Sequence, residues 1–88
     1  ICVSNSGSMM VNGTYRYSGS TYNGKPLYRK GSSTIYYSSS YWYIRDGNIL
    51  SSTNLYRAPG TADTPPSSGW ELIEGLPPLP GVNTGLCP

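Results

Sequence analysis

The stretch that decides the fold is residues 34–45, which read Thr-Ile-Tyr-Tyr-Ser-Ser-Ser-Tyr-Trp-Tyr-Ile-Arg. It holds four of the nine tyrosines and one of the two tryptophans. Aromatic and β-branched residues at this density favour pleated backbone. The three serines at its centre are too small and too polar to continue a buried strand, so they predict a turn. The stretch is therefore predicted to be a β-hairpin with strands at about 34–37 and 41–45.

Side chains alternate across a strand, so the second strand of this hairpin is expected to have two unlike faces. Trp42 and Ile44 share one face, which we interpret as part of the core. Tyr41, Tyr43 and Arg45 share the other face. The predicted outer face is therefore a row of phenols that ends in a guanidinium.

The chain has 88 residues, which is enough for one small domain over 1–88. A domain of this size buries only somewhat more than ~60% of the surface that its extended chain exposes, so its core is thin. With no Phe and two Trp, tyrosine rings must supply much of the buried area. Eleven Gly, eight Pro and only 11% charged residues are typical of short strands joined by tight turns. The composition excludes a helical or coiled-coil fold.

Outside the hairpin, short alternating runs separated by turn dipeptides predict the remaining strands. These strands are expected at about 14–17, 27–30, 54–57 and 70–73, with turns at Asn12-Gly13, Asn23-Gly24 and Asp46-Gly47 and loops at 18–23 and 58–69. The predicted fold class is all-β, a small antiparallel meander of about five to six short strands with long Pro/Gly loops. The core module covers about 12–73; Trp70 is expected to cap the core, and Met9-Met10-Val11 to form a short apolar plug.

Residues 74–88 are predicted to form an extended strap, because Leu76-Pro77-Pro78-Leu79-Pro80 has a polyproline-like composition. The strap would bring Cys87 to Cys2, and a disulfide between them would stabilise the thin core by roughly 4–5 kcal/mol. An intermolecular bridge or two reduced thiols are the alternatives. A disulfide implies an oxidising compartment. The start at Ile1, without a basic-then-apolar leader, is expected of a secreted protein whose signal peptide has been removed, although a trimmed chain would look the same.

The charged residues exclude several classes of function. The net charge is +2 and only Arg29 and Lys30 are adjacent, so no basic block is present to bind nucleic acid or an anionic membrane. No apolar run approaches the ~20 residues of a membrane helix. Histidine is absent and the four carboxylates are not arranged as a facing pair, so we expect no enzyme activity, no cofactor and no metal. Asp46-Gly47-Asn48 is interpreted as a turn, because a calcium loop needs further acidic ligands.

What remains is binding through an aromatic and weakly charged surface. Sugars pack their apolar C–H faces on aromatic rings, and their hydroxyls pair with Asp, Asn, Lys and Arg side chains. The end of the hairpin and its neighbouring turn supply both kinds of group. The predicted carbohydrate site contains Tyr41, Tyr43, Arg45, Asp46, Asn48, Asn23 and Lys25. Otherwise these residues would serve only to cover a thin sheet and to form its turns.

The spacing of several motifs resembles a small β module that occurs in algal, other protist and marine proteins. These motifs are Asn12-Gly13-Thr14-Tyr15, Tyr22-Asn23-Gly24-Lys25-Pro26-Leu27-Tyr28, Ile35-Tyr36-Tyr37-Ser38, Trp42-Tyr43-Ile44, Leu55-Tyr56 and Thr64-Pro65-Pro66 through Gly69-Trp70. More narrowly, the chain is similar to the small lectins of siphonous green algae of the Codium type. That resemblance implies an agglutinin that binds N-acetylgalactosamine. It covers about residues 12–73 and supplies no sugar-contacting positions.

We therefore expect a secreted lectin without enzyme activity whose partners are N-acetylgalactosamine-type glycans. Agglutination needs at least two sites, so a homodimer is expected. One alternative is an adhesion or protein-interaction module that uses the same tyrosine face, and another is a small disulfide-tied inhibitor that presents residues 58–69. Asn12-Gly13-Thr14 is also an N-glycosylation sequon, although its Asn-Gly pair is already explained as a turn.

Overall fold

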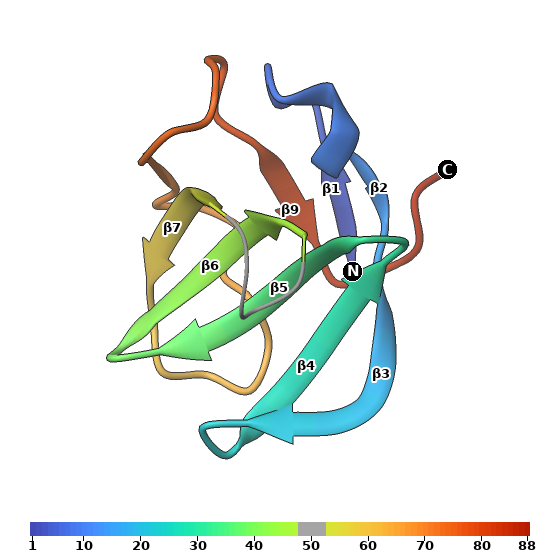
Figure 1. The fold of residues 1–88 in the computed structure, drawn as a ribbon, viewed down its shortest axis with the longest axis vertical. Coiled ribbons are helices and arrows are strands. Elements are labelled where there is room, and N and C mark those ends of the chain that lie inside the picture. The colour runs from blue at the N-terminus through green and yellow to red at the C-terminus, as the bar shows by residue number, and fades with distance from the viewer. Residues whose placement is uncertain (48–52) are drawn as a thin grey trace.

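The computed structural model describes residues 1–47 and 53–88, and its regular elements there are short strands and one turn of 3-10 helix, η1 (Figure 1). The elements are β1 (Cys2–Ser4), η1 (Met9–Val11), β2 (Gly13–Thr14), β3 (Arg16–Tyr22), β4 (Lys25–Lys30), β5 (Ser33–Ser38), β6 (Tyr41–Asp46), β7 (Thr53–Pro59), β8 (Glu71–Leu72) and β9 (Gly81–Asn83). They form a six-stranded sheet in the order β3-β4-β5-β6-β7-β8 and a three-stranded sheet in the order β2-β1-β9. Every pairing is antiparallel, so the predicted fold class is confirmed.

The predicted hairpin is the centre of the larger sheet. Its strands β5 and β6 are joined by a two-residue turn in which Ser39 and Ser40 have φ of 51° and 69°. Positive φ at both central residues belongs to a type I′ turn, whose twist matches the right-handed twist of the paired strands. Asn23 and Gly24 have φ of 54° and 82° and join β3 to β4 in the same way.

The prediction of a loop at 18–23 is wrong, because most of this segment belongs to β3. β3 is an edge strand and all seven of its residues are exposed. Its register against β4 shifts between Tyr17 and Thr21, so the small polar residues between them form a bulge. Their composition therefore reflects an exposed sheet edge and not a loop.

The predicted apolar plug at Met9-Met10-Val11 is also wrong in part. Met9 is 80% exposed and Met10 is 59% exposed, whereas Val11 is buried. The three residues form η1, and successive side chains of a 3-10 helix point in directions about a third of a turn apart. Only one of the three can therefore point into the core.

Two strands near the chain ends were not predicted. β1 lies in the polar segment before η1, and β9 lies inside the C-terminal strap. Val3 and Val82 face each other in this pair and are both buried. A three-residue strand is too short to show an alternating pattern, and its partner comes from the opposite end of the chain.

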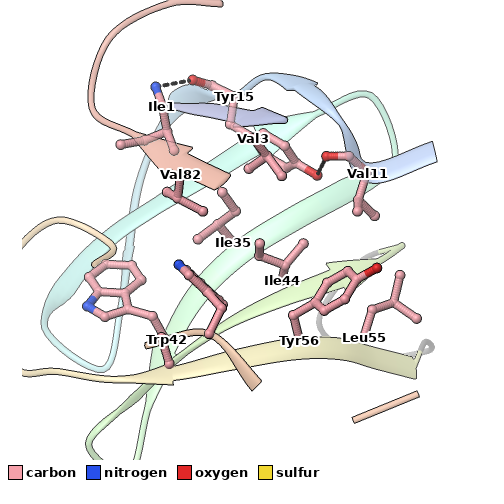
Figure 2. Packing of buried hydrophobic residues seen from close by; sticks show 12 residues of the cluster. Ile1, Val3, Val11, Tyr15, Ile35, Trp42, Ile44, Leu55, Tyr56 and Val82 are labelled. Atoms are coloured by element: carbon pink, nitrogen blue, oxygen red, sulfur yellow. Dashed lines mark hydrogen bonds between the residues drawn. The ribbon is translucent and has the colours of Figure 1, made fainter. Parts of the chain in front are cut away.

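The core lies between the two sheets (Figure 2). Its residues are Ile1, Val3, Val11, Tyr15, Ile35, Trp42, Ile44, Leu55, Tyr56, Ala58, Trp70 and Val82. Tyrosine rings contribute to it as predicted, and Trp70 caps it. The Tyr15 hydroxyl donates to the Val11 carbonyl at 2.8 Å, and the Tyr56 hydroxyl donates to the Leu76 carbonyl at 2.6 Å. The rings thus bury their apolar bodies while their hydroxyls remain hydrogen-bonded.

The predicted disulfide joins Cys2 to Cys87 within one chain, with their Cα atoms 4.8 Å apart. It ties β1 to the segment after β9, and it is the kind of bond that an oxidising environment maintains. The strap is held along its course as well, because the Gly7 N–H donates to the Pro78 carbonyl and the Leu76 N–H donates to Ser8 Oγ. Within the described ranges, no helix has the length and apolar character required to cross a membrane.

The amide of Asn12 closes the N-terminal loop. Its Oδ1 accepts the Ser6 N–H and its Nδ2 donates to the Ser6 carbonyl, both at 3.1 Å. These two hydrogen bonds give the asparagine of the sequon a structural role, and attachment of a glycan at Nδ2 would disturb one of them.

Candidate functional site

The outer face of the larger sheet carries a row of aromatic and charged side chains. Tyr36, Tyr43, Arg57 and Glu71 are successive cross-strand partners on β5, β6, β7 and β8. Directly opposed residues point to the same side of a sheet. Because side chains alternate along β6, this side is opposite to the one that buries Trp42.

The tyrosine rings of this face stand against one another. The rings of Tyr36 and Tyr43 are stacked, with their centroids 5.2 Å apart and 15° between their planes. Tyr41 lies beside Tyr43 at 6.3 Å, and Tyr22 meets Tyr36 edge-on at 5.7 Å. Such offset and edge contacts are favourable, so the rings hold one another in place.

One guanidinium group lies over the exposed part of the row. The Arg57 Cζ is 4.4 Å from the centroid of the Tyr41 ring, and its Nε donates to Glu71 Oε1 at 3.1 Å. The hydrogen bond to Glu71, followed by one to Tyr43, raises the pKa of Arg57. Arg57 therefore joins two rings and a carboxylate while it remains half-exposed.

A second guanidinium group is tied to the base of the row. The Arg45 Cζ is 5.4 Å from the centroid of Tyr36, and its Nε donates to Asn54 Oδ1 at 3.0 Å. The same oxygen accepts the Tyr36 hydroxyl at 2.6 Å. Tyr36 is only 6% exposed, and this burial raises the pKa of its hydroxyl. Tyr36 therefore supports the row from below, whereas Tyr41 and Tyr43 are half-buried and reach its surface.

We call this set the Tyr41 cluster; it contains Tyr22, Tyr36, Tyr41, Tyr43, Arg45, Asn54, Arg57 and Glu71. Three of the predicted site residues, Tyr41, Tyr43 and Arg45, lie together in it. Asp46 follows Arg45 in the strand and so points to the other face. Its charge adds to the rise that burial causes in the pKa of Tyr15, and none of the described contacts joins it to the cluster. Asn48 lies outside the described residues.

The other two predicted residues, Asn23 and Lys25, lie at a different place. The Lys25 Nζ is 4.9 Å from the centroid of the Tyr37 ring and 3.2 Å from Asp63 Oδ1. The Asn23 Nδ2 donates to the Tyr37 carbonyl at 2.9 Å. The Tyr37 ring points to the core side of the sheet, where it meets Trp42 at 5.7 Å. The residues predicted as one site are therefore divided between two faces of the sheet.

The division follows from the position of the β3–β4 turn at the end of β5. From this turn Tyr22 reaches Tyr36 on one face, and Lys25 reaches Tyr37, the next residue, on the other. The ring of Tyr28 also contacts Trp42, at 6.2 Å. We call this second set the Tyr37 cluster; it contains Asn23, Lys25, Tyr28, Tyr37 and Asp63.

Sequence reasoning missed several members of the two clusters. Tyr36 could have been placed, because a two-residue turn at Ser39 and Ser40 puts Tyr36 directly opposite Tyr43. Arg57 and Glu71 could not, because the register of β7 against β6 shifts between Ile44 and Arg45 and no local pattern signals this shift. Asp63 lies in a loop, where sequence spacing gives no position.

Both clusters combine aromatic rings, charged donors and carboxylate acceptors, which are groups that can bind a ligand noncovalently. The described residues contain no group of three His, Cys, Asp or Glu side chains that could hold a metal ion. Comparison of the chain with protein-family models, with curated proteins and with solved structures finds no match.

Proposed function

We propose that the chain is a carbohydrate-binding lectin that recognises N-acetylgalactosamine-type sugars through the Tyr41 cluster. The observation that carries this proposal is the row of tyrosine rings in mutual contact, with a guanidinium group over Tyr41 at 4.4 Å from the ring centroid. Sugar recognition needs an aromatic surface for C–H groups beside fixed donors and acceptors for hydroxyl and acetamide groups. The row supplies both on one face.

Preorganisation also supports the proposal. Asn54 Oδ1 accepts hydrogen bonds from both Tyr36 and Arg45, so the lower layer of the row is ordered before any ligand arrives. A ligand that meets groups already in place loses less binding free energy to ordering of side chains.

The half-exposed Arg57 would take a direct part in binding. Its guanidinium occupies one face of the Tyr41 ring, but its ion pair with Glu71 is open to solvent, with side-chain exposures of 41% and 50%. Solvent-exposed ion pairs are screened and contribute little, so a sugar can replace this contact at small cost. Arg57 would then donate to the acetamide carbonyl of the sugar and Glu71 would accept its hydroxyls.

The wider setting of the proposal is a secreted agglutinin of the kind found in siphonous green algae. The intramolecular disulfide supports an oxidising, extracellular setting. Agglutination needs two or more sites on one particle, for which a homodimer is the arrangement expected from the sequence.

A matched pair of variants tests the proposal. Arg57→Ala is expected to weaken binding of N-acetylgalactosamine roughly tenfold, since it removes a charged donor. Arg29→Ala, which removes an exposed arginine outside both clusters, should leave binding unchanged. Binding is measured by a glycan array followed by titration of tyrosine and tryptophan fluorescence. Absence of any glycan signal, together with no hapten-inhibitable red-cell agglutination, would contradict the proposal.

The second candidate function is an extracellular protein-interaction module that uses the same face. The observation that favours it is the combination of tyrosine and arginine in the row, since both residue types are enriched at protein interfaces. Free N-acetylgalactosamine at millimolar concentration separates the two functions. It should change the intrinsic fluorescence of a lectin and leave that of a protein-interaction module unchanged.

A further inference from the structure

The Tyr37 cluster repeats the parts of the Tyr41 cluster on the other face of the same sheet. In each, a cation lies over a tyrosine ring: Arg57 at 4.4 Å from the centroid of Tyr41, and Lys25 at 4.9 Å from that of Tyr37. In each, the cation is also paired with a carboxylate, at 3.1 Å in the first cluster and 3.2 Å in the second. The groups on which the proposed function rests are thus present twice.

The second cluster is partly open to solvent although its rings lie on the core side, and the side chain of its cation, Lys25, is 17% exposed. Tyr37 and Tyr28 are half-buried and are packed against the fully buried core, not inside it. Tyr17, the cross-strand partner of Tyr28, is 56% exposed, so the smaller sheet does not cover this end of the larger one. Asp63 extends from the loop between β7 and β8 with its side chain 83% exposed.

A hydrogen bond from the core holds the loop between β7 and β8 beside the rings. The indole N–H of Trp42 donates to the carbonyl of Ala62 at 3.2 Å, next to Asp63 in the chain. Trp42 also contacts the rings of Tyr37 and Tyr28. The buried Trp42 side chain therefore positions both the Tyr37 and Tyr28 rings and the loop that carries Asp63.

We infer that the Tyr37 cluster is a second carbohydrate site, so that one chain binds two sugars on opposite faces of its larger sheet. This inference rests on the proposed function of the Tyr41 cluster. The Tyr37 and Tyr28 rings take the C–H face of a sugar, Asp63 accepts two of its hydroxyls, and Lys25 donates to a third. The ligand is a sugar with neighbouring hydroxyls, of the same class as the ligand of the first site.

Two sites on opposite faces have a consequence for agglutination. They point away from each other, so one chain links two cell surfaces without a partner chain. A monomer that agglutinates cells is then the expected state, in place of the homodimer expected from the sequence.

Equilibrium dialysis with N-acetylgalactosamine, read as the number of sugars bound per chain, tests the inference. At a sugar concentration that fills both sites of the unaltered protein but not a site weakened tenfold, we expect two sugars per chain in the unaltered protein and about one in Lys25→Ala, in Asp63→Ala and in Arg57→Ala. Glu74→Ala removes an exposed carboxylate outside both clusters and should keep two. Each single-site variant should fold as the unaltered protein does by thermal unfolding and should lose agglutination when analytical ultracentrifugation shows it monomeric.

The outcomes separate this inference from the proposed function. One sugar per chain in the unaltered protein, with binding weakened in Arg57→Ala and unchanged in Asp63→Ala, overturns the second site and leaves the proposed function in place. Two sugars per chain that both persist in Lys25→Ala and Asp63→Ala place the second site elsewhere and also overturn the inference. Absence of binding in every variant and in the unaltered protein overturns the proposed function as well.

Discussion

The Tyr41 and Tyr37 clusters contain the same kinds of groups but are assembled in different ways. Most members of the Tyr41 cluster lie on four successive strands, so sheet register places them. In the Tyr37 cluster, Asn23 comes from a turn and Asp63 from a loop. The first is therefore as rigid as the sheet, whereas the second depends on how two connections pack at its edge.

The two clusters also differ in the kind of cation that they contain. Arg57 presents a planar guanidinium on a half-exposed side chain, and Lys25 presents a compact ammonium on a side chain that is only 17% exposed. A planar guanidinium fixes the orientation of the groups that it pairs with, whereas an ammonium is a point charge that accepts partners from several directions. We expect the Tyr41 cluster to discriminate more strongly between related sugars than the Tyr37 cluster.

Removal of the disulfide is expected to have the largest effect and to abolish the difference between the clusters. Cys2→Ser with Cys87→Ser should lower the free energy of unfolding by about 4–5 kcal/mol, because the bond closes nearly the whole chain. Urea denaturation measures this, with the oxidised protein as reference. Both clusters lie on the same domain, which the disulfide stabilises, so binding at both should be lost together. Loss of binding at only one cluster would contradict this expectation.

Substitutions in the Ser39-Ser40 turn should stabilise the hairpin of β5 and β6, whose strands contribute residues to both clusters. Ser39→Asn with Ser40→Gly should raise the free energy of unfolding by about 1–2 kcal/mol, because Asn-Gly tolerates the positive φ of both positions better than Ser-Ser does. Thermal unfolding measures the gain. Ser20→Gly, at an exposed strand position without positive φ, is the control and should destabilise slightly. Equal effects of the two changes would contradict the turn assignment.

Removal of a single hydroxyl tests whether the hydrogen bond between Tyr36 and Asn54 orders the Tyr41 cluster. Tyr36→Phe removes the 2.6 Å hydrogen bond to Asn54 and should cost about 1 kcal/mol of stability. It should also weaken sugar binding at the Tyr41 cluster and leave the other cluster unchanged, as measured by titration of single-site variants. Tyr37→Phe is the matched control, because its hydroxyl makes no hydrogen bond among the described residues. Equal losses of stability in Tyr36→Phe and Tyr37→Phe would show that the hydrogen bond of the Tyr36 hydroxyl does not contribute.

The smallest effect is expected in the alkaline titration of the tyrosines, in which one phenol of each cluster should behave in the same way. Burial raises the pKa of Tyr36 in one cluster and of Tyr28 in the other above the ordinary value of 10.0. Below pH 10 these phenols are neutral in the folded and unfolded chain, so they add no pH dependence there. As the pH rises above 10, the unfolded chain ionises first and stability falls.

Ultraviolet absorbance of tyrosinate measures this titration. The phenols of Tyr36 and Tyr28 should ionise at a pH above the ordinary tyrosine pKa of 10.0. Tyr36→Phe and Tyr28→Phe should each remove one late phase. A single phase for all tyrosines would contradict the burial of these two rings.

Much of the larger sheet could be predicted from local patterns. The aromatic hairpin, its serine turn and the alternation that separates Trp42 from Tyr41 and Tyr43 all follow from residues near one another in sequence. Pairing of β1 with β9 could not be predicted, because each has three residues and its partner is distant in the chain. The same limit applied to the candidate site: spacing placed Tyr41, Tyr43 and Arg45 together but could not show which face Lys25 reaches.

The sequence by itself determined that this chain is a thin, tyrosine-rich, antiparallel β domain, because alternation and turn chemistry act over a few residues. It also determined that Cys2 and Cys87 were available to close the chain. Only the tertiary structure decided that the polar and aromatic groups form two clusters back to back. The reason is that Arg57, Glu71 and Asp63 are brought to the rings by long-range strand register and loop packing, which adjacent residues do not encode.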